Sequence, residues 1–163
     1  MARDKEIPRI EVEAGDSLVG LGEVGILVLG PPKAFVRGGG AIFGANNASV
    51  VLKVTYGEFS LLLTGDAELR EESYLLRWGE RIRAKVLKLG HHGASSSSSP
   101  HFLEAVHPEV AVISVGAYNP FGHPSPEVLD RLRAVGSRVL RTDRMGAVLF
   151  RVSRGRWRVR TML

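Results

Sequence analysis

Residues 84–93 are Ala84-Lys85-Val86-Leu87-Lys88-Leu89-Gly90-His91-His92-Gly93, an apolar run that ends in a pair of histidines between two glycines. Two other apolar runs also end in polar residues. Residues 61–63 lead into Thr64-Gly65-Asp66, and residues 110–115 lead through a short loop to His123. Ligands gather at the carboxyl ends of strands in an α/β layer, so we expect these polar residues to converge on one edge of a sheet.

Strands and helices alternate through the middle of the chain, which predicts an α/β layer rather than a β-sandwich or a helical bundle. A β-hairpin is predicted where the apolar runs 49–56 and 59–63 flank Gly57-Glu58, a two-residue turn signal. Helices are predicted over about ten residues after Asp66, at 102–106, and through Ala134 from the cap Ser125. The other strands are predicted at 9–13, 24–29, 84–89, 110–115, 137–141, 146–152 and 156–161.

The composition fits one compact domain over residues 1–163, because 44% of the residues are apolar and 24% are charged. No run approaches the roughly 18 to 20 apolar residues that span a bilayer, and no apolar segment follows residues 1–6, so neither a transmembrane segment nor a signal peptide is expected in this chain. Without cysteine, any metal must be held by histidine and carboxylate side chains.

The net charge of +5 is unevenly distributed. Residues 131–163 hold ten arginines and one acid, Asp143, a local balance of +9, so the other 130 residues sum to −4. In residues 156–161 arginine alternates with Trp157 and Val159, so this strand is expected to bury Trp157 and expose arginine. The arginines form either a solvated face or a surface for polyanions.

The strand-end residues also have purely structural interpretations. Asp66 could cap a helix that begins at Ala67, a role compatible with metal binding. The glycines around His91 and His92 let the backbone approach another group closely, but the pair could also be an exposed turn.

The other three histidines also have structural interpretations. His123 could be a plain turn residue, because the following proline restricts it to extended conformations. His101 and His107 lie beside a helix start and a strand start, and both are expected on the surface.

Six motifs follow one another in order: Asn46-Asn47-Ala48-Ser49, Thr64-Gly65-Asp66-Ala67-Glu68, Gly90-His91-His92-Gly93, Ser114-Val115-Gly116 followed by Asn119, Gly122-His123-Pro124, and Arg141-Thr142-Asp143 followed by Gly146. This series resembles the second half of the C-terminal metallo-β-lactamase-fold domain of ComEC, the bacterial DNA-internalisation competence protein family. The resemblance covers nearly the whole chain from about residue 9. It implies an α/β fold, half of the metallo-β-lactamase αββα sandwich, with a mixed β-sheet and flanking helices.

The resemblance also implies roles for four residues. Asp66 would be the carboxylate that bridges two metal ions, zinc or manganese in the complete family domain, and His123 would be a terminal metal ligand. His92 would face the scissile phosphate as a catalytic residue, with His91 supporting it. Two-metal hydrolysis of a phosphodiester, with DNA as the substrate, is the chemistry that these roles fit.

The chain departs from the family at its start. The family builds most of its site from an earlier His-x-His-x-Asp-His motif, yet no histidine precedes His91 here. Asp66 and His123 are fewer than the three protein ligands of a catalytic zinc, so we expect the isolated chain to be an incomplete enzyme that binds no metal tightly. The family is a membrane protein in which this domain is soluble, and the resemblance implies an extracytoplasmic location.

Two hypotheses about function follow. The first is a metal-dependent hydrolase domain of the phosphodiesterase or nuclease type, which needs its other half. The second is a non-catalytic remnant that self-associates and binds a polyanion through its arginine-rich C-terminal region. Under either, an apolar sheet face formed by residues 50–54 and 61–63 is expected to lack its cover. We predict a homodimer through this face, unless the first 45 residues fold back across it.

Overall fold

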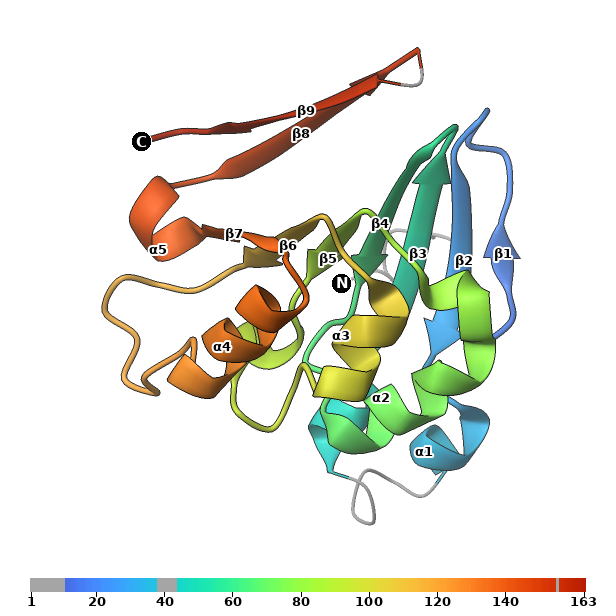
Figure 1. Ribbon diagram of the computed structural model, residues 1–163. Helices are drawn as coiled ribbons and strands as arrows, with labels where there is room; N and C mark the ends of the chain where they lie inside the picture. The colour runs from blue at the N-terminus through green and yellow to red at the C-terminus, as the bar shows by residue number, and fades with distance from the viewer. Residues whose placement is uncertain (1–10, 38–43, 155) are drawn as a thin grey trace, which may run out of the picture.

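The computed structural model describes residues 11–37, 44–154 and 156–163. Its main element is a seven-stranded sheet whose spatial order is the order of the strands along the chain (Figure 1). The strands are β1 (Ser17–Leu18), β2 (Gly25–Gly30), β3 (Val51–Tyr56), β4 (Phe59–Leu63), β5 (Val86–Lys88), β6 (Val110–Ile113) and β7 (Arg138–Arg141). The pairs from β1 to β4 are antiparallel and those from β4 to β7 are parallel. The predicted mixed α/β sheet is therefore confirmed.

Helices cover one face of this sheet, as Figure 1 shows for α2, α3 and α4. They are α1 (Lys33–Arg37), α2 (Leu69–Leu75), α3 (Pro100–Val106), α4 (Pro126–Ala134) and α5 (Thr142–Met145), with 3-10 turns η2 (Ala45–Ala48), η3 (Leu76–Ile82) and η4 (Gly90–Gly93). The main core lies beneath them, where Leu62, Leu87 and Ile113 of the sheet pack with Leu103 and Leu132 of the helices. In the described part of the chain, no helix combines the length and apolarity that crossing a membrane requires.

A hairpin of β8 (Val148–Ser153) and β9 (Arg156–Thr161) crosses the opposite face of the sheet. It buries a second core against Phe59, Val86, Val110 and Leu140. Its inward residues include Trp157, as predicted from the alternation. The sheet face expected to be bare is therefore covered in part by the chain itself.

Local sequence signals account for several elements. The β3–β4 hairpin turns at Gly57-Glu58 as predicted, with Gly57 at a φ of 53° that glycine adopts without strain. Ser125 caps α4 as predicted, since its hydroxyl accepts a hydrogen bond from the Val128 N–H. Ser99 caps α3 in the same way, and Pro100 is the first residue of that helix.

Three predictions need correction. Of the strand expected at 9–13, residues 9 and 10 lie outside the described part of the chain and residues 11–13 are not in a strand. The helix after Asp66 begins only at Leu69 and passes at Leu76 into a 3-10 segment with a non-helical Gly79. The alternative in which the N-terminal segment folds back across the sheet is also wrong for the residues described. There, β2 pairs with β3 and is a further strand of the same sheet, not a cover over its face.

Candidate functional site

The structure brings Asp66, His91, His92 and His123 together at the carboxyl ends of β4, β5 and β6. The Nε2 atom of His92 lies 3.7 Å from the Asp66 Oδ1. The ring centroid of His91 is 6.5 Å from that of His92 and 5.6 Å from that of His123. These side chains come from three loops that are far apart in sequence, and the parallel arrangement of the strands places the loops at one edge.

The two adjacent histidines have an uncommon backbone conformation. His91 (φ 45°, ψ 43°) and His92 (φ 56°, ψ 19°) are both left-handed, which costs on the order of 1 to 3 kcal/mol for each non-glycine residue. Close packing holds the turn in place on both sides. A Cβ atom added at Gly90 would lie 2.5 Å from the Ala67 carbonyl oxygen, and one at Gly93 would lie 2.8 Å from Pro124 Cβ. Such a strained, tightly packed turn is typical of a functional site.

His91 is held by a carboxylate that the sequence analysis did not single out. Its Nδ1 lies 2.9 Å from Glu68 Oε1, which also accepts hydrogen bonds from the Ser96 hydroxyl (2.7 Å) and the Asn46 amide (3.5 Å). Burial opposes ionisation of Glu68, but the hydrogen bonds from Ser96, His91 and Asn46 together lower its pKa. Glu68 is therefore an ionised carboxylate that orients the His91 ring.

His92 is oriented by the backbone. Its Nδ1 lies 2.6 Å from the carbonyl oxygen of Ser114, and because a carbonyl only accepts, Nδ1 carries the hydrogen. Nε2 is thus turned toward the half-exposed carboxylate of Asp66 and toward solvent. The arrangement leaves Nε2 available to a ligand at the open edge of the site.

Asp66 does not cap a helix. The residue before α2 is Glu68, whose side chain makes no capping hydrogen bond. The Asp66 N–H donates to the Ser49 hydroxyl (2.9 Å), and Gly65 lets the two segments approach so closely that an added Cβ would lie 2.9 Å from Ser49 Cβ. The capping interpretation is therefore wrong, and the carboxylate faces His92.

The His123 loop is fixed by Asn119. The His123 N–H donates to Asn119 Oδ1, and the Asn119 amide donates to the His123 carbonyl, both at 2.9 Å. The ring of Phe121 stacks on the imidazole with centroids 6.0 Å apart. Desolvation, together with the nearby His91 and His92, lowers the pKa of His123, which favours the neutral ring that a metal or a proton donor can use.

The side chains of Lys88 and Thr142 hold the strand ends that carry the site. The Lys88 ammonium donates to the Gly65 carbonyl at 2.9 Å, and burial lowers its pKa although Asp66 raises it. Thr142, at the start of α5, accepts from the Val115 N–H and donates to the Val115 carbonyl, both at 2.8 Å, and so anchors the strand end that carries Ser114. His101 and His107 are exposed, as predicted.

The donor set fits a metal only in part. Carboxylate and imidazole are ligands that suit zinc or manganese. Within the described residues, however, no group of three or more histidine, aspartate or glutamate side chains is arranged to hold a metal ion. The residues present here do not by themselves meet the three-ligand requirement of a catalytic zinc.

Comparison with known proteins shows that part of the chain is similar to part of two longer bacterial proteins. It is 47% identical to competence protein ComA of Neisseria gonorrhoeae over 111 residues, which are 68% of this chain and 16% of that protein. It is 41% identical to ComE operon protein 3 of Bacillus subtilis (strain 168) over 106 residues, which are 65% of this chain and 14% of that protein. No protein-family model matches the chain.

Among solved structures, the chain is similar to a mutant of CmlA β-hydroxylase, with a TM-score of 0.54, 13% sequence identity and coverage of 81% of this chain and 32% of that chain. That protein has the metallo-β-lactamase fold. The predicted fold, one half of the αββα sandwich, is therefore confirmed. The chain spans about 14 to 16% of the length of the curated relatives named above.

Proposed function

We propose that this chain is one layer of a ComEC-like hydrolase domain of the metal-dependent phosphodiesterase or nuclease type, which acts on DNA during competence. The convergence of Asp66, His92 and His123 at one sheet edge carries this proposal. The similarity to competence protein ComA and to ComE operon protein 3 supports it. In the parent protein the domain would be a soluble part of a membrane protein, outside the cytoplasm.

Each residue has a proposed role at this edge. Asp66 and His123 are metal ligands, to which further ligands must be added from outside the described residues. His92 is the catalytic residue that touches the scissile phosphate, because Nδ1 is engaged by Ser114 and Nε2 points to the open side. A protonated Nε2 donates a hydrogen bond to a phosphate oxygen that gains negative charge. His91, oriented by Glu68, is a supporting residue that keeps the His pair in place.

The test joins residues 11–163 to the first part of the corresponding domain of the Bacillus subtilis relative in one polypeptide. We expect this fusion to cleave labelled DNA when zinc or manganese is added. His92→Asn should lower kcat by about 100-fold or more, the usual cost of losing one donor to a developing oxyanion. Asp66→Ala and His123→Ala should also weaken metal binding.

The exposed residue His101 gives the matched control, since His101→Asn removes an imidazole elsewhere on the surface. Its fusion should cleave DNA at the parent rate. A folded, metal-loaded fusion without activity would contradict the proposal. Unchanged kcat in the His92→Asn fusion would contradict the role of His92.

A second candidate is a non-catalytic, self-associating layer, which the incomplete donor set favours. Both candidates predict weak metal binding by the unaccompanied chain, because Asp66 and His123 supply few ligands. Isothermal titration with zinc should therefore show no tight stoichiometric binding. Tight one-to-one binding would contradict both, and activity of the fusion separates them.

A further inference from the structure

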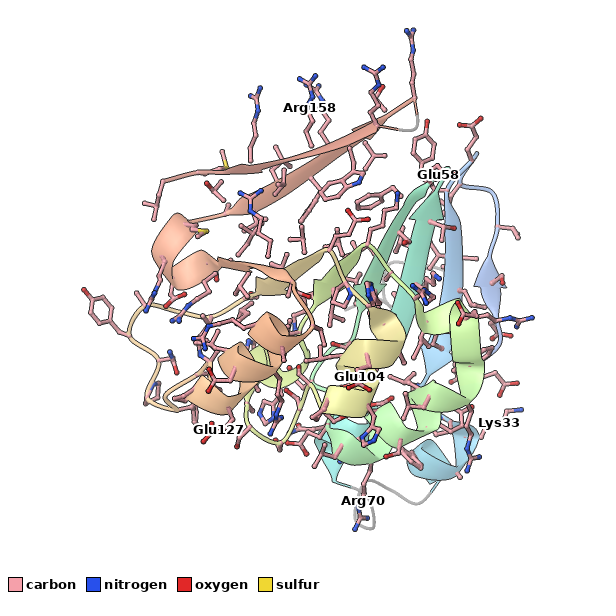
Figure 2. All side chains as sticks on the ribbon, in the orientation of Figure 1. Lys33, Glu58, Arg70, Glu104, Glu127 and Arg158 are labelled. Carbon is pink, nitrogen blue, oxygen red and sulfur yellow. The ribbon has the colours of Figure 1, made fainter. Side chains whose placement is uncertain are left out.

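The outer face of the β8–β9 hairpin is strongly basic. Exposed and half-buried residues alternate along both strands. The half-buried residues pack on the sheet, and the exposed ones turn away from it. Figure 2 shows these side chains, with Arg158 labelled, projecting from the hairpin away from the rest of the molecule. We call this surface the arginine face, and its charged members are Arg151, Arg156, Arg158 and Arg160.

The register of the hairpin places like charges together. Arg151 lies directly opposite Arg158, while Ser153 faces Arg156 and Leu149 faces Arg160. Like charges directly opposite each other destabilise a strand pair. Residues 148–163 contain no acidic side chain that could compensate. In the part of the chain that the structure describes, none of the four arginines makes an ion pair or a hydrogen bond through its side chain.

The fold does not need these charges. The hairpin is anchored from its other side, where Phe150 and Trp157 pack on Phe59 with ring centroids 6.2 and 5.9 Å apart. The arginine face therefore adds electrostatic repulsion without packing. An anionic partner bound across the face would attract each arginine and so offset their mutual repulsion.

We propose that the arginine face binds the phosphate backbone of DNA without reading its sequence; the choice of DNA among polyanions rests on the proposed function. Arginine suits this role because its planar, always-charged fork can bind phosphate through two hydrogen bonds. Along β9, arginines at every second residue lie about 6.6 Å apart, so they form a row of cations on one side of the strand. The face carries no aromatic side chain on which a base could stack, which favours contacts to the phosphate backbone.

The same composition argues against a membrane surface as the partner. Segments that lie in a bilayer interface insert tryptophan, phenylalanine or leucine from the side that meets the lipid. Here Trp157 and Phe150 point into the protein, and Leu149 is the one large apolar side chain on the arginine face. The inference does not depend on hydrolysis, because the site of Asp66, His92 and His123 is built from other elements.

The experiment measures fluorescence anisotropy of a labelled random-sequence DNA duplex with the full chain in EDTA, from 50 to 300 mM salt. Each phosphate contact contributes about −0.9 to the slope of log K against log salt. The double variant Arg151→Gln/Arg158→Gln should make the slope about 2 units shallower. At 0.1 M salt it should weaken binding roughly 60-fold, which is the same relation applied to two contacts.

The control Arg77→Gln/Arg81→Gln removes the same charge from exposed arginines of η3 on the other side of the sheet. It should leave the slope within about half a unit of the parent value, since its guanidinium groups are not in the proposed contact. An equal loss in both variants would show an effect of net charge alone and overturn the proposal. So would absence of DNA binding at 50 mM salt, or a strong preference for one sequence.

A parallel titration with phosphatidylserine–phosphatidylcholine vesicles tests the membrane as partner. Vesicle binding that depends on Arg151 and Arg158, with no such dependence for DNA, would also overturn the proposal. Circular dichroism of each variant checks that the hairpin is intact. EDTA removes metal ions, so this experiment measures binding without hydrolysis. A negative result would therefore contradict the arginine face but not the proposed hydrolytic site.

Discussion

Glu71 of α2 has a carboxyl group that is completely buried. Its Oε2 accepts a hydrogen bond from the Ser49 N–H at 3.1 Å, while Oε1 has no partner within the described residues. Gly30 makes room for it, since an added Cβ there would lie 2.7 Å from Oε1. Burial raises the pKa of Glu71 to about 8, although the Ser49 hydrogen bond lowers it. The side chain is therefore mostly protonated at neutral pH.

This burial predicts a pH-dependent loss of stability. Between the ordinary pKa of 4.5 and the folded value of about 8, the unfolded chain has released the proton that the folded protein keeps, so a rise in pH favours unfolding. From pH 6 to pH 8, Glu71 should remove about 2 kcal/mol from the free energy of unfolding. Glu71→Gln, which keeps the shape without the charge, should abolish that part of the loss in urea titrations at the two pH values.

Glu104 provides the comparison for this substitution, because it is an exposed glutamate on α3. Glu104→Gln should keep the parent difference between pH 6 and pH 8. An unchanged pH dependence in Glu71→Gln would show that Glu71 is already ionised in the folded protein.

At the same scale, the sequence predicted which residues meet at the site but not how they are held. Strand-end placement identified Asp66, His92 and His123, because the ends of parallel strands share an edge. Nothing local indicates that His91 and His92 adopt left-handed conformations, which the packing of Gly90 and Gly93 imposes. Glu68 was missed because its role depends on Asn46, His91 and Ser96, which lie 22 to 28 residues away.

Among the elements, the β8–β9 hairpin depends most on a few aromatic contacts. The ring centroids of Phe150 and Trp157 are 5.9 Å apart, and both rings pack near Phe59 of β4. Among the described residues, the hairpin pairs with no other strand, so its backbone hydrogen bonds do not tie it to the sheet. Apolar packing is thus the main force that holds it there.

Trp157→Ala should therefore lower the free energy of unfolding by about 2 to 4 kcal/mol, somewhat less than for a fully buried tryptophan. Hydrogen exchange should quicken in β8 and β9 more than in β3 to β5. The fully exposed Tyr118 offers a matched loss of an aromatic ring, and Tyr118→Ala should change neither measurement. Equal effects of the two substitutions would show that the aromatic cluster does not hold the hairpin.

Elements with local signals were predicted well, and elements that depend on distant packing were not. The β3–β4 hairpin follows from its two-residue turn, and α4 follows from a serine cap and Pro126. The short helix α1 and the single turn α5 carry no such signal. The helix after Asp66 starts late because residues 64–68 are engaged by Ser49, Lys88 and His91 instead of starting a helix.

At the scale of the whole molecule, the sheet face opposite the helices has one part that the β8–β9 hairpin covers and one part that it leaves uncovered. Phe59, Val86 and Leu140 lie under the β8–β9 hairpin. Leu52 and Val54 of β3 point outward but lie outside that cluster, and Val50, just before β3, is 53% exposed. The uncovered part is thus smaller than expected and centres on β3.

We still expect a homodimer through this remaining face, most simply about a two-fold axis. Sedimentation equilibrium at tens of micromolar should show a concentration-dependent mass above the 17.7 kDa of one chain. Val54→Lys, which places a charge on the face, should shift the equilibrium to monomer. Leu69→Lys, at a residue of α2 that is 49% exposed, should not. A single 17.7 kDa species at every concentration would rule out the dimer.

The sheet also has a consequence for synthesis, because its strands lie side by side in the order in which a ribosome makes them. Each strand from β2 to β7 pairs with its immediate predecessor, so the growing chain always presents the edge that the next strand needs. Within the described sheet, no strand has to be inserted between two that have already paired. The sheet can therefore assemble vectorially during translation, before the β8–β9 hairpin emerges and closes over Phe59 and Val86.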